Sequence, residues 1–176
     1  INMMKDKYDF CILKKFKNPK KIKVLDYGCG DGSFLQYLKK QGVSCEGFEI
    51  DKASIKKLEN KKIQFSEDID KIKPNSLDLC VMFDVLEHLT DPINDLINIK
   101  TKLKKNGKIV IYTPNINSLA FELMGSEQNQ VYPFQHIFFF GSKSFNYLTK
   151  KSKLKIINKS TYGLDMMDYF FMKEHL

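Results

Sequence analysis

Ile22-Lys23-Val24-Leu25-Asp26-Tyr27-Gly28-Cys29-Gly30-Asp31-Gly32 is the stretch that decides the fold of this chain. Its first half is a short, β-branched apolar run that ends in an acidic residue, which predicts a buried strand. Glycines follow at once, and apolar residues then recur with helical spacing from Ser33 to Lys40, where Gly42 ends the helix. The chain therefore begins its core with a strand, a glycine loop and a helix.

Strands and helices alternate after this motif. We expect strands over residues 44–49, 63–65, 77–83 and 108–113, and helices over 52–60, from 92 onward and over 142–151. Asp91 and Ser142 are the expected caps of the last two helices. Weaker signals indicate a helix over 115–125, a loop over 126–133, a strand over 155–157 and another within 162–176. Alternation at intervals of about 20 residues predicts a parallel, doubly wound α/β sheet.

Length and composition bound the class of protein. A chain of 176 residues can build one core and is too short for two ordinary domains. No apolar run reaches the ~18 residues of a membrane span, and residues 1–10 lack the layout of a secretory signal. The four cysteines form no CxxC pair. Reduced thiols explain them best, so we expect a cytoplasmic protein.

The net charge of +8 raises the question of nucleic-acid binding. All 29 basic residues are Lys, and the sequence contains no Arg. Arg supplies the planar, bidentate donor group that recognises guanine edges and phosphates, so a nucleic-acid site without any Arg would be unusual. The lysines are also scattered along the chain, which favours a solvated surface over a recognition patch.

The glycine loop predicts a cofactor site. In an open α/β sheet, ligands bind beyond the carboxyl ends of the strands, where this loop lies. A dinucleotide-binding GxGxxG motif would require glycine at position 33, where Ser33 stands. Asp26 and Asp31 flank the glycines, and acidic side chains suit a cationic ligand better than a pyrophosphate. A carboxylate here can balance the ammonium and sulfonium charges of S-adenosylmethionine.

A second acidic residue supports a nucleoside ligand. Glu49 ends the next strand, about twenty residues beyond the loop, where a carboxylate can accept hydrogen bonds from both ribose hydroxyls. Taken alone, this feature fits NAD equally well. It favours S-adenosylmethionine because it accompanies this particular glycine loop.

Four stretches carry a family resemblance. Residues 24–32 resemble motif I of class I S-adenosylmethionine-dependent methyltransferases, and residues 78–89, which contain Leu86-Glu87-His88, resemble their fourth-strand motif. Residues 103–108 are similar to the turn into their fifth strand. Residues 136–148 resemble a stretch of the ubiquinone-pathway-like subgroup, in the methyltransferase type 11/12/23 group. The match covers roughly residues 20–160.

The resemblance implies a fold and a cofactor. The fold is α/β, a Rossmann-like three-layer sandwich with a mostly parallel sheet of the seven-stranded type, in a single domain over 1–176. The cofactor is S-adenosyl-L-methionine, with S-adenosyl-L-homocysteine as its product. Gly28 and Gly30 would approach the methionine moiety, Glu49 would hold the ribose, Asp68 and Ile69 would flank the adenine, and Phe83 would offer backbone contacts. The expected cofactor-binding residues are Asp26, Gly28, Cys29, Gly30, Glu49, Ile50, Asp68, Ile69, Phe83 and Asp84.

Two histidines are the candidate catalytic residues. A hydroxyl acceptor must lose a proton during methyl transfer, so a histidine near the methyl group would help. His88 follows the fourth strand and is either a general base or a loop anchor, and His136 either faces the substrate or supports the loop. Asp84, Glu87, His88 and His136 also resemble a divalent-metal site of some O-methyltransferases, although those enzymes carry Glu where this chain has Asp84. The Phe-rich stretch 134–140 either packs on the sheet or lines an acceptor pocket.

These residues predict an enzyme, an S-adenosylmethionine-dependent O-methyltransferase that acts on a small molecule or a glycan precursor. An RNA-directed methyltransferase is the alternative among enzymes, and the missing Arg disfavours it. A methyltransferase-like module that binds the cofactor without catalysis is the alternative from another class. The intact glycine loop and Glu49 argue against that alternative.

Overall fold

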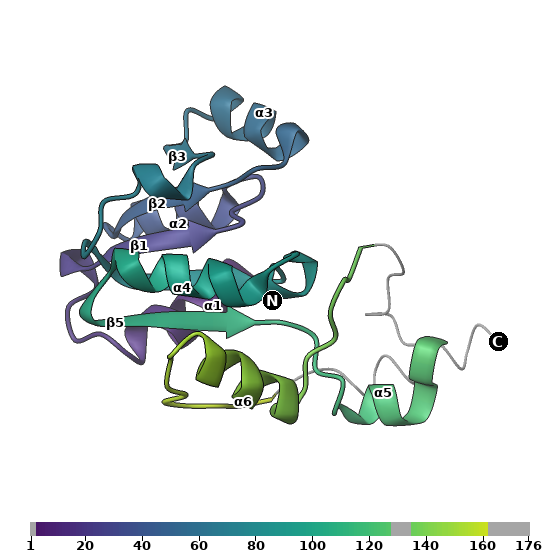
Figure 1. Ribbon diagram of the computed structural model, residues 1–176. Helices are drawn as coiled ribbons and strands as arrows, with labels where there is room; N and C mark the ends of the chain where they lie inside the picture. The colour runs from purple at the N-terminus through teal and green to yellow at the C-terminus, as the bar shows by residue number, and fades with distance from the viewer. Residues whose placement is uncertain (1–2, 128–134, 162–176) are drawn as a thin grey trace. The chain divides into compact units, whose positions relative to one another are not determined.

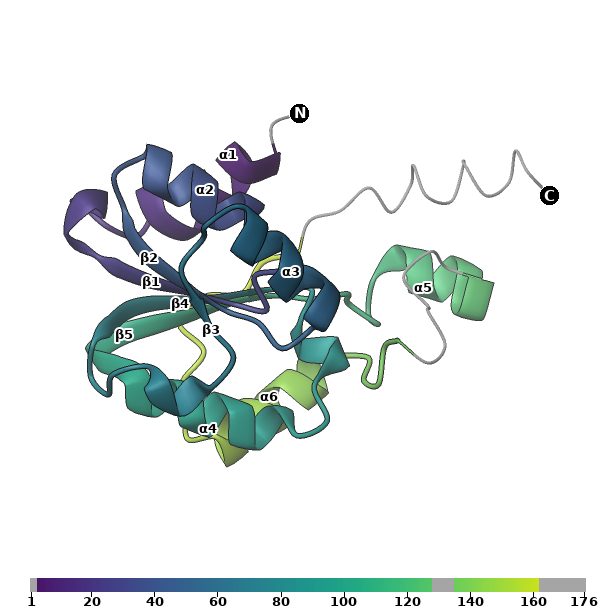
Figure 2. The ribbon, with the colours of Figure 1, turned by 90° about the horizontal axis from the view of Figure 1, so that it is seen from above.

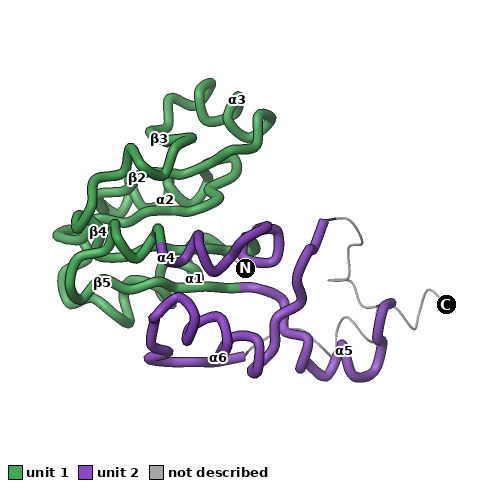
Figure 3. Tube along the Cα trace, in the orientation of Figure 1, with its two compact units in different colours: residues 1–85, 98–112 green, residues 86–97, 113–176 purple. Residues whose placement is uncertain are grey.

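The computed structural model describes residues 3–127 and 135–161. The chain divides into two compact units (Figure 3). Unit 1 comprises residues 1–85 and 98–112, and unit 2 comprises residues 86–97 and 113–176. That residues 1–176 form a single domain stays a prediction.

Unit 1 contains a parallel five-stranded sheet with the strand order β3-β2-β1-β4-β5 (Figure 1). The strands are β1 (Lys23–Tyr27), β2 (Ser44–Phe48), β3 (Phe65–Ser66), β4 (Leu77–Phe83) and β5 (Leu103–Tyr112). The chain moves outward from β1 to β2 and β3 and then returns to the other side of β1 with β4. The strand order therefore reverses between β1 and β4, which is where α/β proteins bind their ligands.

Helices cover this sheet. α1 (Met3–Tyr8) and α2 (Ser33–Lys40) lie side by side on one face (Figure 2), and α3 (Lys52–Asn60) connects β2 to β3. Apolar side chains of these helices pack on β1 and β4, where Val24, Leu79 and Val81 are fully buried. Burying a Val or Leu side chain contributes roughly 1.5–3 kcal/mol, so these strands anchor the core. The sheet and its helices form a Rossmann-like α/β fold.

Shorter elements complete unit 1. A π-helical turn covers Asp9–Leu13, and 3₁₀ turns cover Pro19–Lys21 and Ile69–Lys71. α4 (Pro92–Lys102) begins in unit 2 and ends in unit 1. Asp91 caps α4, as predicted, since its Oδ1 accepts a hydrogen bond from the Asn94 N–H at 3.1 Å.

Unit 2 contains α5 (Leu119–Met124), α6 (Ser142–Lys151) and two 3₁₀ turns, Leu86–His88 and Gly125–Glu127. A single parallel bridge joins Asn115 to Phe140. The predicted cap of α6 is wrong by one residue. Gly141 is the N-cap, because its carbonyl accepts the first helical hydrogen bond from Phe145 at 3.0 Å and its N–H donates to the Ser144 hydroxyl at 2.8 Å.

The other element predictions have mixed outcomes. The expected strands over 44–49, 77–83 and 108–113 are confirmed, although β5 begins earlier, at Leu103. The expected strand over 155–157 is wrong: these residues are irregular, and Ile156 and Ile157 are exposed, so no strand among the described residues pairs with them. Residues 162–176 and most of the loop predicted over 126–133 lie outside the described residues.

Two further predictions are reduced cysteines and no membrane-spanning segment. All four cysteines are free and buried. In the described part of the chain, none of the helices has both the length and the apolar character needed to cross a bilayer.

Candidate active site

The glycine loop leaves β1 at the point where the strand order reverses. The N–H groups of Gly28 and Cys29 both donate to the Phe48 carbonyl, at 2.8 and 3.1 Å, which ties the loop to β2. Gly28 and Gly30 have left-handed backbones, with φ of +73° and +55°. A Cβ atom on Gly28 would lie 2.5 Å from Val85, whereas one on Gly30 would meet nothing within 4 Å. The loop therefore exposes its backbone to open space at Gly30, where a ligand can approach.

Glu49 is fixed against this loop by three backbone donors. Its Oε2 accepts from the Gly30 N–H at 2.7 Å, and its Oε1 accepts from Ile50 and Asp51 at 2.8 and 2.9 Å. The carboxylate follows β2, is buried, and keeps acceptor capacity because two carboxylate oxygens offer about four lone-pair positions. It can accept further hydrogen bonds from a hydroxyl-bearing ligand. The side chain of Ile50 is exposed beside it.

Asp26 is a buried carboxyl group at the same edge of the sheet. It is only 4% exposed, and burial raises its pKa to about 7, with the ammonium group of Lys7 opposing that rise and Glu49 adding to it. Such a carboxyl gains most from a cation placed beside it. Sequence reasoning missed Lys7, whose Nζ lies 4.3 Å from the Phe83 ring centroid. No pattern distinguishes it from the other 28 lysines.

Asp31 has partners of its own. Its Oδ2 lies 2.8 Å from Lys61 Nζ and accepts from the Ser33 hydroxyl at 2.8 Å, and its Oδ1 accepts from the Ser33 N–H at 3.0 Å. The hydrogen bond from Lys61, followed by those from Ser33, lowers the pKa of Asp31 to about 2. The expectation that Asp31 balances a ligand charge therefore weakens, and Asp26 and Glu49 remain as the buried acidic groups of the site.

The other expected cofactor residues lie at strand ends or loops of unit 1. Phe83 is the last residue of β4, and Asp84 follows it. Asp84 has a left-handed backbone, with a φ of +55°, and its N–H donates to the Tyr112 carbonyl at 2.9 Å. Asp68 and Ile69 begin the 3₁₀ turn after β3, and Asp68 Oδ1 accepts from the Asp70 N–H at 2.9 Å. Cys29 is buried, and burial raises the pKa of its thiol to about 12, so the thiol has no nucleophilic character at neutral pH.

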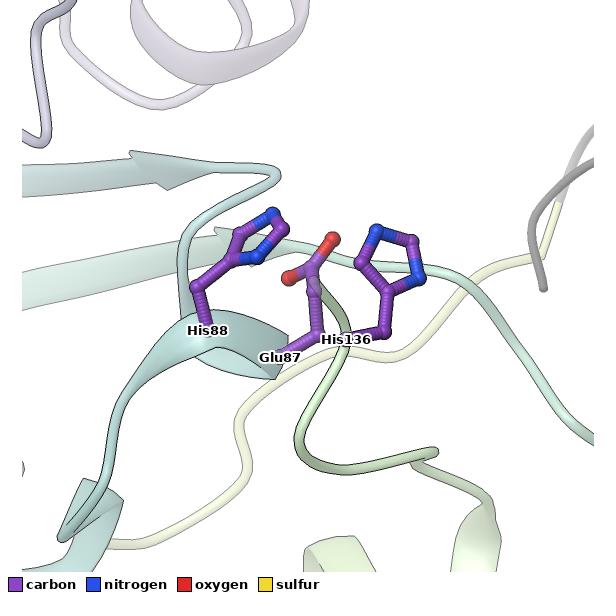
Figure 4. A group of neighbouring side chains, drawn as sticks. All are labelled: Glu87, His88 and His136. Carbon is purple, nitrogen blue, oxygen red and sulfur yellow. The ribbon is translucent and has the colours of Figure 1, made fainter. Parts of the chain in front are cut away.

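Glu87, His88 and His136 form a second cluster, in unit 2. One possible ligand atom from each lies within 4.8 Å of the others, and Figure 4 shows the Glu87 carboxylate between the two imidazole rings. Glu87 is 1% exposed; its Oε2 accepts from the Thr113 hydroxyl at 2.8 Å, and its buried Oε1 has no donor among the described residues. A buried carboxylate oxygen of this kind is costly unless a donor or cation reaches it.

The segment that carries His136 is held to this cluster. The Glu87 carbonyl accepts from the N–H groups of Ile137 and Phe138 at 2.8 and 3.1 Å. His88 Nδ1 lies 2.7 Å from the Gln135 carbonyl. Because a carbonyl only accepts, Nδ1 carries the hydrogen, and a neutral His88 ring has its lone pair on Nε2. That nitrogen can act as a base or as a metal ligand.

Two further predictions concern this region. Asp84, the fourth residue of the predicted metal set, belongs to unit 1, so the cluster within unit 2 holds three of the four. In the Phe-rich stretch, Phe140 is buried and its ring centroid lies 5.5 Å from that of Phe145, which indicates packing. Phe138 is exposed. Phe134 lies outside the described residues.

A family model for a methyltransferase domain matches residues 3–159. The chain belongs to this methyltransferase family. The match covers the glycine loop, Glu49 and the Glu87 cluster, and it confirms the predicted family, the class I S-adenosylmethionine-dependent methyltransferases. The parallel sheet and its helices confirm the predicted Rossmann-like fold class.

Similar proteins agree with this assignment. The ubiquinone biosynthesis O-methyltransferase of Pelagibacter ubique is 33% identical over 130 residues, covering 68% of this chain and 54% of that protein. The enzyme of the same name from Aliivibrio fischeri strain MJ11 is 30% identical over 118 residues, covering 60% and 50%. This methyltransferase therefore spans about half the length of the curated relatives it matches.

Solved structures agree on the fold. A SAM-dependent methyltransferase from Archaeoglobus fulgidus superposes with a TM-score of 0.67 at 20% identity, covering 98% of this chain and 85% of that one. In the present chain, the residues of the site fit the family's cofactor. The open backbone at Gly30 admits a ligand, and the buried carboxyl groups of Asp26 and Glu49 suit a cation that carries ribose hydroxyls.

Proposed function

We propose that this methyltransferase transfers a methyl group to an oxygen atom of a small molecule. The observation that carries the proposal is the arrangement of Glu87, His88 and His136, in which the bond to Gln135 leaves His88 Nε2 with its lone pair. Such a nitrogen can take the proton of a hydroxyl group. The O-methyltransferase names of the relatives from Pelagibacter ubique and Aliivibrio fischeri support the same choice.

The cofactor-binding roles are part of the proposal. S-adenosylmethionine, when bound, supplies a methyl group on a sulfonium, which is already a good leaving group. Gly28 and Gly30 would admit its methionine moiety, Asp26 would balance its positive charge, and Glu49 would accept from the ribose hydroxyls. Residues Cys29, Ile50, Asp68, Ile69, Phe83 and Asp84 would complete the site. Holding donor and acceptor in line can supply about 7–11 kcal/mol of the barrier.

A metal-assisted form of the reaction is a second candidate, and one observation favours it. The buried Oε1 of Glu87 has no donor among the described residues, and two imidazole groups stand beside it. A divalent cation held by Glu87, His88 and His136 would satisfy this oxygen and lower the pKa of a bound hydroxyl. Isothermal titration with Mg²⁺ and Mn²⁺ tests the idea directly. Absent binding, together with unchanged activity in EDTA, excludes it.

The acceptor class follows from the same chemistry. A small molecule or a glycan precursor offers the hydroxyl group that the histidines can deprotonate, whereas a chain without Arg is poorly suited to RNA. The buried free cysteines accord with a reaction in the cytoplasm.

The test is a transfer assay with methyl-labelled S-adenosylmethionine and a panel of phenols, catechols, monosaccharides and short RNAs. We expect turnover of a hydroxylated small molecule, and general-base catalysis of this kind is typically worth about 10²–10⁴-fold. His88→Ala should lower kcat by that order without changing cofactor affinity, and Lys56→Met, at an exposed lysine of α3, is the control. Full activity of both His88→Ala and His136→Ala would refute the proposal, and so would methylation of RNA alone.

A further inference from the structure

The glycine loop is contacted at Asp31 and Gly32 by α3 and the residues that follow it. Lys61, the C-cap of α3, donates from Nζ to the Asp31 backbone carbonyl at 2.9 Å and to Asp31 Oδ2 at 2.8 Å. A Cβ atom on Gly32 would lie 2.4 Å from Ile63 and 2.7 Å from Leu58, so these two side chains press directly on the loop backbone. Two hydrogen bonds and two apolar contacts thus fix residues 31 and 32.

The inner side of the same loop meets the candidate ribose-binding carboxylate. The Gly30 N–H donates to Glu49 Oε2 at 2.7 Å, next to the position where the loop backbone faces open space. Gly30 directly precedes Asp31, so the residue that bonds Glu49 and the residue that bonds Lys61 are neighbours in one short loop.

We propose that Lys61 is a positioning residue for cofactor binding: its bonds to Asp31 hold the glycine loop in the conformation that receives S-adenosylmethionine. The Ser33 contacts leave Asp31 with a second, local partner. Lys61 is the long-range one, joined to Asp31 across 30 positions of sequence. Lys61 links the loop after β1 to α3, the helix after β2, through its ion pair with Asp31.

The expected effect of losing Lys61 on cofactor affinity follows from the solvent exposure of the ion pair. The Lys61 and Asp31 side chains are 35% and 45% exposed, so solvent screens their attraction. Exposed ion pairs of this kind support an effect of about two- to five-fold on a binding constant. Lys61 touches neither reacting group, so its loss should raise KM for the cofactor and leave kcat unchanged.

The charge of the ligand separates this role from a general charge effect. S-adenosylmethionine carries one net positive charge, and S-adenosylhomocysteine carries none. Removing a lysine would relieve long-range repulsion of the cationic ligand and so favour it, and would leave the neutral ligand unaffected. Loss of a loop contact instead weakens both ligands by the same factor.

The experiment is isothermal titration of the intact chain with each ligand. Lys61→Met should weaken both ligands about two- to five-fold, Lys61→Arg should bind as the parent does, and Lys56→Met, at an exposed lysine of the same helix, is the control. Lys61→Met should weaken ligand binding less when Asp31 is already replaced by Asn, because the ion pair is then absent. When Asp31 is present, 1 M salt should also reduce the loss of affinity that Lys61→Met causes.

Two results would overturn the proposal. Lys61→Met could bind both ligands as tightly as the parent, and a lowered unfolding midpoint in that case would make Lys61 a residue of fold stability alone. Alternatively, Lys56→Met could weaken both ligands as much as Lys61→Met does. Each result concerns cofactor binding without an acceptor, so it leaves the proposed oxygen acceptor and histidine roles untouched.

Discussion

Replacing Asp26 with Asn removes a buried charge and keeps the shape of the side chain. Burial raises the pKa of Asp26 from its ordinary value of 3.8 to about 7, against the opposing effect of Lys7. Each pKa unit corresponds to 1.36 kcal/mol, so ionised Asp26 costs the folded protein up to about 4 kcal/mol above pH 7. Asp26→Asn should therefore stabilise the cofactor-free protein.

The sign of the pH dependence follows from the raised pKa. Between about pH 4 and pH 7 the folded state retains the Asp26 proton that the unfolded state has released, so the parent protein loses stability as pH rises. The Asn variant lacks this loss. The gain in unfolding midpoint should be small at pH 4 and reach its full value near pH 8, where about 4 kcal/mol corresponds to roughly 8–16 °C for a chain of this size.

Cofactor affinity should move in the opposite direction. A cationic ligand beside Asp26 favours the ionised carboxyl, so the parent should bind S-adenosylmethionine more weakly as pH falls below about 7. Asp26→Asn should bind it at least about tenfold more weakly at pH 8 and show a flatter pH profile. The assays are thermal unfolding and isothermal titration from pH 4 to pH 8.

A destabilised Asn variant at pH 8 would refute this reasoning, because it would mean that Asp26 gains more from Lys7 than it loses by burial. An Asn variant that binds the cofactor as tightly as the parent, with the same pH profile, would remove Asp26 from the site. Lys56→Met, a change at an exposed lysine remote in sequence from Asp26, is the control for nonspecific charge effects.

Two further substitutions test the geometry of the site. Glu49→Gln places an amide NH₂ among three backbone donors, so we expect cofactor binding about tenfold weaker or worse by isothermal titration, and parental affinity would contradict the ribose role. Gly28→Ala and Gly30→Ala share the cost of a left-handed backbone, about 1–2 kcal/mol. Only Gly28→Ala also meets Val85, so it should lower the unfolding midpoint further, whereas Gly30→Ala should mainly weaken cofactor binding. Equal midpoints for the two alanine variants would count against the described loop.

The sequence alone determined the order of strands and helices and the cofactor class. These features can be read from residues that are close together in the sequence: the apolar run of β1, the glycines that follow it, and Glu49 at a fixed spacing from them. Such local patterns predict an element because neighbouring residues determine its backbone conformation. The same reasoning failed at residues 155–157, because a short apolar run forms a strand only where a neighbouring strand is available to pair with it.

Only the tertiary structure decided which acidic groups are buried and which are paired with another side chain. Asp26 and Asp31 are equivalent acidic residues in the sequence, but one is buried with a pKa of about 7 and the other is paired with Lys61, thirty residues away, with a pKa of about 2. The sequence also did not predict that Lys7 lies near Asp26 and Phe83, or that His88 keeps its lone pair on Nε2. Burial and long-range pairing set these properties, because the energy of a charge depends on its surroundings in space and the sequence does not list those surroundings.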